Sequence, residues 1–293
     1  MNERNGKPDI ITSPANPRIR KLVELQKKAK LRRETGLFII EGSRLCTDTP
    51  GQYIREVYVT ENRMRNASER EQRLLREHPL TIVSEEVMSK AADTSTPQGI
   101  LCVAGMPVYS REALLGRRQV RDTETDLPEE KGDAPDRKKE PLLLVLEDIQ
   151  DPGNLGTIFR TAEAAGATGI LMSRGTVDLF HPKVVRATMS AIFRMPFYVS
   201  GDLCAELQIL RQSGIRSYAA HLGGKRAYDA LPLTGGCAFL IGNEGNGLSE
   251  ALTAQADEKI IIPMEGGAES LNAAMAAGIL LFEAARQRRM QLV

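Results

Sequence analysis

The chain has no tryptophan, three histidines and four cysteines in 293 residues. The cysteines form no Cys-x-x-Cys pair, and neither they nor the histidines show the spacing of a metal site. The sequence also lacks a Gly-x-Ser-x-Gly turn and a Cys-His pairing. We therefore expect no metal, and we favour a reaction that needs positioning and modest activation over metal-assisted hydrolysis or acyl transfer. The cysteines are predicted to be reduced and mostly buried: Cys46, Cys102, Cys204 and Cys237.

Long apolar runs are missing as well. No stretch of about 18 apolar residues occurs, so we expect no membrane-spanning segment. The start of the sequence, MNERNGKPDI, is polar and lacks the apolar core of a signal peptide. Together with reduced cysteines, these features predict a cytoplasmic protein.

The net charge is only +1, but the charges are unevenly distributed. Residues 1–44 hold eleven Lys or Arg against five Asp or Glu, whereas residues 141–293 hold 13 against 15. A basic front end on a near-neutral body favours a polyanion partner for the first part. On charge alone, a solvated helix face explains the pattern equally well.

Residues 1–110 alternate between strand-like runs and helical stretches, which predicts a small α/β/α domain. After the turn signals Ser13-Pro14 and Asn16-Pro17 we expect a helix that exposes most of its cations. These cations are Arg18, Arg20, Lys21, Lys27, Lys28, Lys30, Arg32 and Arg33. Strands are predicted at 37–42, 55–61, 81–84 and 99–105.

The segment 116–140 holds only two aliphatic residues among many charges, prolines and glycines. Such a segment buries too little apolar surface to offset its ordering entropy. We predict that it is disordered and forms most of a linker at 111–140. The linker joins the first domain to a second one at 141–293.

In residues 141–293, strands alternate with helices, which predicts a mostly parallel sheet. Ligands of such sheets bind outside the carboxyl ends of the strands. Three polar or glycine-rich clusters follow strand-like runs in this part of the chain. We therefore expect the clusters to share one site.

The first cluster is LEDIQDPGNLGTIFRTAEAAGA, residues 146–167, which predicts a strand, a turn and a helix. Asn154 is predicted as the N-cap, and Gly156 as a gap that a ligand approaches. Arg160 presents a guanidinium fork on the face opposite the apolar stripe. That stripe consists of Leu155, Ile158, Phe159 and Ala162. The alternative is a capped helix with a solvated arginine.

The second cluster, FLIGNEGNGLS at 239–249, has three glycines in six residues after an apolar strand. It matches neither Gly-x-Gly-x-x-Gly nor a Walker A sequence. Its Glu244 places a carboxylate at the rim, although a plain surface charge fits as well. The third cluster, IIIPMEGGAESLNAAM, breaks a strand with a Gly-Gly loop before a helix, where Ser270 alternatively serves as a plain N-cap.

Taken together, NLGTIFRTAEAAGA, IGNEGNGLS and IPMEGGAESLNAAMAAGI resemble the three signature motifs of the SpoU (TrmH-like) RNA 2′-O-ribose methyltransferases of the SPOUT superfamily. HPKVVRATMSAIFRMP is similar to that family too. NPRIRKLVELQ, FIIEG and STPQGILCV resemble the L30e-like substrate-binding domain often attached to it. Two stretches depart from the family pattern. Residues 187–191 read Ala-Thr-Met-Ser-Ala in place of Ala-Ser-x-Gly-Ala, and residues 273–275 read Ala-Ala-Met in place of Val-Ser-Val.

The resemblance implies a two-domain α/β fold with a deep trefoil knot in the second domain, an obligate homodimer and S-adenosylmethionine as cofactor. It also implies methylation of a ribose 2′-OH in structured RNA, with 23S ribosomal RNA favoured over transfer RNA. The implied catalytic residues are Asn154, Arg160, Glu244, Ser270 and Asn272. The implied cofactor contacts are Gly242, Asn243, Ile262, Met264 and Leu271. The residues expected to grip RNA phosphates are Arg18, Lys27, Lys28, Arg32 and Arg33.

Three alternatives stay open at this point. The chain could methylate a ribose of transfer RNA, or it could be a non-catalytic RNA-binding ribosome assembly factor on the same fold. It could also methylate a base nitrogen. The presence of all five implied catalytic residues argues against the assembly factor, and the three signatures argue against base methylation.

Overall fold

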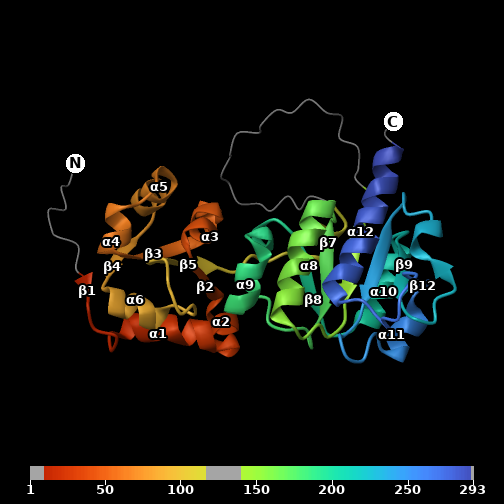
Figure 1. The fold of residues 1–293 in the computed structure, drawn as a ribbon, viewed down its shortest axis with the longest axis horizontal. Coiled ribbons are helices and arrows are strands. Elements are labelled where there is room, and N and C mark those ends of the chain that lie inside the picture. Colours follow the sequence, from red (N-terminus) through yellow and green to blue (C-terminus); the bar gives the residue numbers. More distant parts are fainter. Residues whose placement is uncertain (1–9, 117–139, 292–293) are drawn as a thin grey trace. The chain divides into compact units, whose positions relative to one another are not determined.

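Two β-sheets organise the chain (Figure 1). A computed structural model describes residues 10–116 and 140–291. Contacts group the chain into two units: one holds the first sheet together with Leu155–Arg160 and Val177–Arg194, and the other holds the second sheet. Most of the predicted linker lies outside the described residues, so its disorder and the domain boundaries stay predictions. In the described ranges, no helix has the length and apolarity needed to cross a membrane.

The first sheet has five strands in the order β1-β4-β3-β5-β2. It is mixed, since β5 runs antiparallel to β2 and β3 while β4 runs parallel to β1 and β3. The strands are β1 (Ile10–Ile11), β2 (Leu37–Glu41), β3 (Ile54–Thr60), β4 (Leu80–Val83) and β5 (Ile100–Gly105). The four predicted strands are confirmed within one residue at each end, and only the two-residue β1 was missed.

Seven helical segments accompany this sheet in the described part of residues 10–107. They are α1 (Pro17–Lys27), α2 (Ala29–Thr35), α3 (Ser43–Asp48), η1 (Gly51–Tyr53), α4 (Glu61–Arg65), α5 (Glu69–Glu77) and α6 (Glu85–Ala91). Helix α1 starts where Asn16 caps it and Pro17 occupies its first turn. It buries Ile19, Leu22 and Leu25 in a core shared with α6.

The basic helical stretch predicted after Pro17 is two helices, because the chain is extended at Lys28 (φ −111°, ψ 103°). This break lets Arg32 of α2 fold back onto the end of α1. Its Nη1 donates to the carbonyl oxygens of Leu25 (2.6 Å) and Gln26 (2.9 Å). Carbonyl oxygens in the last turn of a helix have no backbone N–H partner within the helix, and here the Arg32 guanidinium donates to two of them.

The second sheet has seven strands, all parallel, in the order β10-β12-β9-β11-β6-β7-β8. The strands are β6 (Leu142–Leu146), β7 (Gly169–Ser173), β8 (Phe197–Ser200), β9 (Arg216–Ala220), β10 (Arg226–Ala227), β11 (Cys237–Ile241) and β12 (Glu258–Ile261). Every residue of the central strands β6 and β11 is buried, which explains their unbroken apolar sequences. The predicted parallel α/β sheet is confirmed.

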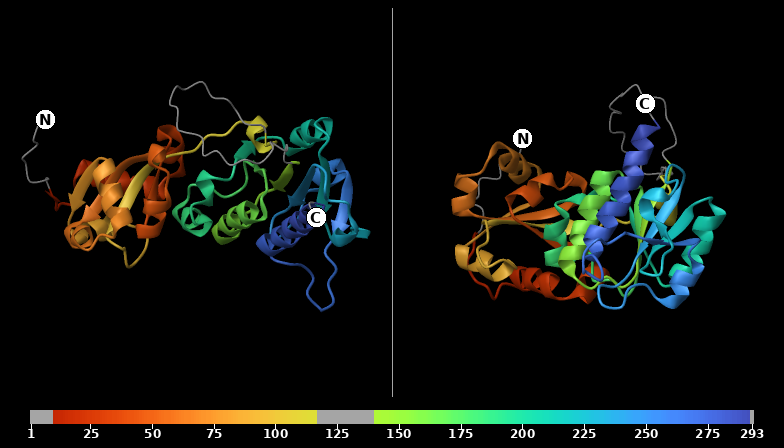
Figure 2. Two further views of the ribbon diagram at one scale, coloured as in Figure 1. Left: turned by 90° about the horizontal axis from the view of Figure 1, so that it is seen from above. Right: turned by 45° about the vertical axis from the view of Figure 1, so that its right-hand side comes forward.

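Helices cover both faces of the second sheet (Figure 2). The helical segments from residue 111 onward are α7 (Arg111–Leu114), α8 (Pro152–Ala165), α9 (Pro182–Thr188), η2 (Ala191–Phe193), α10 (Leu203–Gln212), η3 (Tyr228–Ala230), α11 (Glu250–Gln255) and α12 (Ala273–Met290). On one face, α10 and α11 pack against side chains such as Ala238 and Leu240 of β11. Helix α12 contacts β11 and β6.

The chain has an unusual backbone just after α9, where Met189 and Ser190 both adopt left-handed conformations (φ 49° and 68°). Non-glycine residues rarely do so, and the cost is of order 1 kcal/mol or more for each. Ser190 stands where the family pattern has Gly, so a residue with a Cβ occupies a position suited to glycine. The Ser190 hydroxyl is also buried without a hydrogen-bond partner in the described part of the chain.

Candidate active site

Three residues from separate parts of the chain meet beyond the carboxyl ends of the strands of the second sheet. Asn154 Nδ2 donates to Glu244 Oε1 (2.8 Å), and Asn272 Nδ2 donates to Asn154 Oδ1 (2.8 Å). This row, Glu244–Asn154–Asn272, is called the polar chain below. The structure thus brings together one residue from each of the three sequence clusters, as expected, while their catalytic roles stay predictions.

Asn154 is free to join this row because it does not cap its helix. The N-cap of α8 is Asp151, whose Oδ1 accepts from the Asn154 backbone N–H (2.7 Å), and Pro152 is the first helical residue. The predicted N-cap role of Asn154 is therefore wrong. At the third cluster the cap of α12 is Asn272, whose Oδ1 accepts from the N–H groups of Ala274 (2.9 Å) and Met275 (3.3 Å).

Glu244 ends the polar chain as an acceptor. Besides Asn154, its carboxylate accepts from the backbone N–H groups of Gln150 (3.2 Å) and Asp151 (3.3 Å). Burial raises the pKa of Glu244, but these hydrogen bonds outweigh burial and hold the pKa below its usual value. Glu244 is therefore ionised at neutral pH, and it fixes the orientation of the Asn154 amide.

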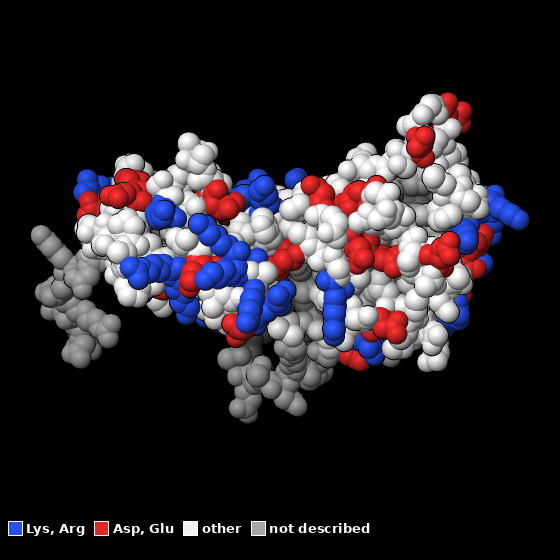
Figure 3. Space-filling view, turned by 90° about the horizontal axis from the view of Figure 1, so that it is seen from below, with Lys and Arg blue, Asp and Glu red and all other residues white. Residues whose placement is uncertain are grey.

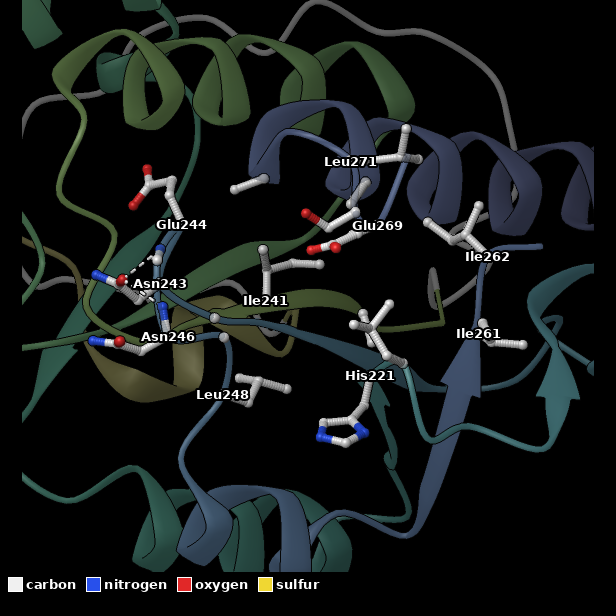
Figure 4. Close-up of a pocket in the computed structure, with 18 of the residues that line it drawn as sticks. His221, Ile241, Asn243, Glu244, Asn246, Leu248, Ile261, Ile262, Glu269 and Leu271 are labelled. Carbon is white, nitrogen blue, oxygen red and sulfur yellow. Dashed lines mark hydrogen bonds between the residues drawn. The ribbon is translucent and has the colours of Figure 1, made fainter. Parts of the chain in front are cut away.

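A cavity of 440 Å³ opens beside Glu244, between the loops that follow β9, β11 and β12 (Figure 4). This volume lies in the range of about 300–1,000 Å³ typical of small-molecule sites. The five predicted cofactor contacts all line it: Gly242, Asn243, Ile262, Met264 and Leu271. Glu244 and Ser270 line it too, so two predicted catalytic residues lie at the same cavity.

The loop after β11 is held in a tight turn that only glycine allows at its start. A Cβ on Gly242 would lie 2.2 Å from backbone atoms of Gly247 and Leu248. The Asn243 side chain fastens the turn, since its Oδ1 accepts from the Gly245 N–H (2.8 Å) and the Asn246 N–H (3.1 Å). The backbone of this loop therefore approaches the cavity closely, as the glycines in the sequence suggested.

His221 and Leu222, in the loop after β9, also line the cavity, and this part of its lining was not predicted from the sequence. The His221 Nδ1 accepts from the Gly223 N–H (2.9 Å), so the neutral ring carries its proton on Nε2. No motif marks this stretch. The signal that could have found it is its position, because it too follows a strand of the parallel sheet.

Gly156 was expected to clear space for a ligand, and this is wrong. Gly156 is buried in the protein, and a Cβ there would lie 2.3 Å from the Ala187 Cβ and 2.9 Å from the Val184 carbonyl oxygen. The glycine permits close packing of α8 against α9. The apolar stripe predicted on α8 is confirmed, with all four of its residues fully buried.

Arg160 lies in α8, six residues after Asn154, and its side chain is exposed. In the part of the chain that the structure describes, its guanidinium makes no hydrogen bond or ion pair. This arginine is therefore not used to stabilise the helix. It is available to an external anion.

Four of the five residues predicted to grip RNA phosphates are exposed on α1, on α2 or at the junction between them: Arg18, Lys27, Lys28 and Arg33. Arg32 is 2% exposed and points inward, where its Nε donates to Asp178 (3.0 Å) in addition to the two α1 carbonyls. Its predicted contact with phosphate is wrong, because the side chain is already fully engaged. Figure 3 shows Lys and Arg side chains gathered on this face, interrupted by a few acidic ones.

Two of these exposed cations have acidic neighbours. Arg18 pairs with Glu56 and donates to the Thr81 hydroxyl (2.6 Å), and Lys28 pairs with Glu24 (2.6 Å). In the described residues, Lys27 and Arg33 have no ion-pair partner. The basic surface of α1 and α2 therefore keeps unpaired positive charge for a polyanion.

A parallel sheet with a glycine-walled cavity and an amide–carboxylate row at its carboxyl edge is the arrangement of an α/β enzyme that binds a small cofactor. The chain matches the SpoU rRNA Methylase family over residues 141–282 and an MRM3-like substrate binding domain over residues 16–102. The chain belongs to the SpoU rRNA methylase family.

Similar proteins support this membership. The chain is 32% identical to 23S rRNA (guanosine(2553)-2′-O)-methyltransferase RlmP of Bacillus subtilis (strain 168), over 93% of this chain and 97% of that protein. It is 29% identical to the mitochondrial rRNA methyltransferase 3 of Mus musculus, over 95% of this chain and 74% of that protein. The two-domain organisation is thus shared along nearly the whole chain.

Solved structures share the fold. An rRNA methyltransferase from Sinorhizobium meliloti matches with a TM-score of 0.78 and 29% identity, over 96% of this chain and 98% of that one. The SpoU methyltransferase AviRb from Streptomyces viridochromogenes, in complex with AdoMet, matches with a TM-score of 0.76 and 26% identity, over 94% of this chain and 98% of that one. Both likenesses extend across the two units.

Proposed function

We propose that this protein transfers a methyl group from S-adenosylmethionine to a ribose 2′-OH of RNA, with 23S ribosomal RNA as the favoured substrate. The observation that carries the proposal is the polar chain Glu244–Asn154–Asn272 beside a cavity lined by all five expected cofactor contacts. The named activities of the relatives, which include 2′-O-methylation of 23S rRNA, point in the same direction.

The cavity suits S-adenosylmethionine in both shape and charge. Ile241, Ile262 and Leu248 provide apolar walls for a planar base. Of the described residues that line the cavity, two are acidic and none is Lys or Arg, which favours a ligand with positive charge. When bound, this cofactor supplies a methyl group on a positively charged sulfur, ready for attack by an oxygen nucleophile.

The protein's own residues then have to align the 2′-OH and stabilise the charge that develops on its oxygen. Arginine has a pKa above about 12 and is a poor base, so we assign Arg160 as an electrostatic clamp on that oxygen or on the neighbouring phosphate. Glu244 orients Asn154, and Asn154 orients Asn272. Ser270, which lines the cavity next to these groups, is assigned to hold the ribose.

RNA is held, in this proposal, by the exposed cations of α1 and α2, namely Arg18, Lys27, Lys28 and Arg33. Phosphate contacts of this kind supply affinity without sequence information. The substrate-binding domain matched by residues 16–102 contains this surface. Transfer RNA is the alternative substrate. The reaction would be the same 2′-O-methylation, but the modified nucleotide would be a different one.

The homodimer and the trefoil knot implied by the family resemblance also belong to this proposal, as does a cytoplasmic location. Helix α12 supports the dimer, because Met275 and Phe282, two turns apart, are 60% and 45% exposed. Large apolar side chains exposed on one helix are typical of a surface that a partner covers. Light scattering of purified protein should give twice the chain mass of 32.2 kDa, and a Phe282→Glu variant should shift it toward the monomer.

The central test is transfer of labelled methyl groups to RNA from a strain that lacks this protein, followed by alkaline hydrolysis. A ribose 2′-O-methyl group blocks cleavage at its own phosphodiester, so the label should appear in alkali-resistant dinucleotides. Label released in mononucleotides would indicate base methylation and contradict the proposal. Absence of transfer, with RNA binding intact, would instead support the non-catalytic assembly factor.

A further inference from the structure

The cavity contains a carboxylate that neither the polar chain nor the expected cofactor contacts account for. Glu269 lines the cavity, and Figure 4 shows its carboxylate turned toward the interior between the loops. In the described part of the chain, this carboxylate has no hydrogen-bond or ion-pair partner. Glu269 stands three residues before Asn272 of the polar chain, and Ser270 and Leu271 between them also line the cavity.

The two carboxylates of the cavity, Glu244 and Glu269, differ in how many of their oxygen lone pairs are free to interact with a ligand. Glu244 accepts hydrogen bonds from the Asn154 side chain and from two backbone N–H groups, so its capacity is largely used. Glu269 is uncommitted, and the described lining residues include no Lys or Arg that would neutralise it. An uncompensated carboxylate in a cavity favours a cationic group of the ligand.

We propose that Glu269 is a specificity-determining residue that selects the cationic sulfonium of S-adenosylmethionine over the neutral thioether of S-adenosylhomocysteine. The inference rests on the proposed function, because it concerns the cofactor of that reaction. In this proposal the sulfonium, which carries the methyl group to be transferred, lies on the side of the cavity formed by the loop at residues 269–271, close in sequence to Asn272 of the polar chain. Once the methyl group has left, the positive charge is gone and the attraction to Glu269 with it.

This charge difference favours exchange of product for fresh cofactor. The α-ammonium and carboxylate groups are the same in both molecules, so uniform contacts to them hold the two equally. A carboxylate facing the sulfur is the contact that tells them apart. Because Glu269 is exposed in the free protein, solvent screens the attraction, and a moderate effect is expected.

The test is a pair of binding isotherms on the full-length protein without RNA, for S-adenosylmethionine and for S-adenosylhomocysteine. Glu269→Gln keeps the size of the side chain. It should lower the affinity for S-adenosylmethionine about three- to tenfold and change the affinity for S-adenosylhomocysteine by no more than about twofold. Glu269→Asp should retain part of the preference. Raising the salt concentration should reduce the preference of the wild type but not of the Gln variant.

Glu265→Gln is the matched control, because Glu265 is exposed in the same loop and is not among the cavity-lining residues. It should leave both affinities unchanged. An equal loss of affinity for both ligands in Glu269→Gln would overturn the inference, since it would place the carboxylate at the shared ammonium or give it a structural role. So would unchanged affinity for both. Wild-type protein that binds neither ligand would refute the cofactor itself, a separate failure of the proposed function that removes the role of Glu269 as well.

Discussion

The side chains of Asn154 and Asn272, 118 positions apart in the sequence, share a hydrogen bond of 2.8 Å between Asn272 Nδ2 and Asn154 Oδ1. The same Asn154 amide donates to Glu244, so its two ends are occupied by residues from two other loops. The amide cannot turn over without placing like groups against each other at both ends. One asparagine therefore sets the relative orientation of three loops around the proposed reaction centre.

Asn272 has two separable functions, and two substitutions should distinguish them. Asn272→Asp keeps an oxygen to cap α12 but cannot donate to Asn154, whereas Asn272→Ala loses both. We expect the Asp variant to retain nearly wild-type thermal stability and to lose methyl transfer about tenfold or more, since an orienting hydrogen bond is removed. The Ala variant should in addition lose about 1 kcal/mol of stability. Melting curves and single-turnover rates measure the two effects, and equal stability of both variants would argue against the capping role.

Arg160 should be needed for the chemical step and not for cofactor binding. Arg160→Ala is expected to lower the rate of methyl transfer about 10²–10³-fold, the usual loss when a donor to a developing charge is removed. Arg160→Lys should recover little of this, because an ammonium lacks the planar fork of the guanidinium. Calorimetric binding of S-adenosylmethionine should be unchanged in both. Wild-type rates in the Ala variant would exclude Arg160 from the mechanism.

Much of the second unit could be predicted from the sequence because its central strands β6 and β11 are buried on both faces. The unbroken run Leu142–Leu146 is the direct result of that burial. The five residues expected to contact the cofactor lie around one cavity, since parallel strands bring the loops after their carboxyl ends together, while their contact with the cofactor stays a prediction. Local pattern and sheet geometry were sufficient for these features.

The wrong predictions involve partners that are distant in the sequence or choices between neighbouring caps. Arg32 resembled its exposed neighbours because nothing nearby indicates that its partner is Asp178, 146 positions away. Asn154 is a good cap by residue type, but Asp151 stands directly before Pro152, and proline favours the first turn of a helix. The role of Gly156 was missed because the sequence does not reveal that α9 packs on it.

The basic surface of α1 and α2 should bind RNA through phosphates. Alanine substitution of Lys27, Lys28 and Arg33 should weaken RNA binding and reduce the slope of log K against log salt by roughly 0.7–0.9 for each phosphate that the protein no longer neutralises. Filter binding at several salt concentrations measures the slope. Lys259→Ala, which removes an exposed cation of β12, is the control and should change it little. A slope equal to that of the wild type in the triple variant would place the RNA elsewhere.

Glu71 should make the stability of the first unit sensitive to acid. Its side chain is fully buried, closes a capping box with Ser68 and pairs with Arg63. Burial raises the pKa of Glu71, but the hydrogen bonds from Ser68 and Arg63 outweigh this and lower it below the unfolded value of 4.5. A lowered folded pKa means that the stabilisation is complete above pH 4.5 and is lost as the pH falls through the folded pKa.

Glu71→Gln should therefore destabilise the protein at pH 7, by about 1–3 kcal/mol for a buried charged group that loses its partner. The difference from wild type should shrink as the pH falls from 4.5 through the lower folded pKa of Glu71, because the unfolded wild-type chain then binds a proton more readily than the folded one. Thermal melts across this range measure the effect. Glu69→Gln, an exposed change in the same helix turn, should show little dependence of this kind. A Glu71→Gln deficit that stays constant with pH would indicate a packing defect and not the loss of a charge.

Ser190 offers a route to a more stable protein. Its backbone is left-handed (φ 68°), and its buried hydroxyl has no partner in the described part of the chain. Ser190→Gly removes both costs, so we expect the free energy of unfolding to rise by about 1 kcal/mol, although glycine also gains entropy in the unfolded chain. Ser190→Ala removes only the hydroxyl and keeps the strained backbone, so it should gain less than the glycine variant. Denaturant titration of both variants separates the two contributions, and an alanine variant as stable as the glycine variant would show that the unpaired hydroxyl, and not the backbone, is the source of the cost.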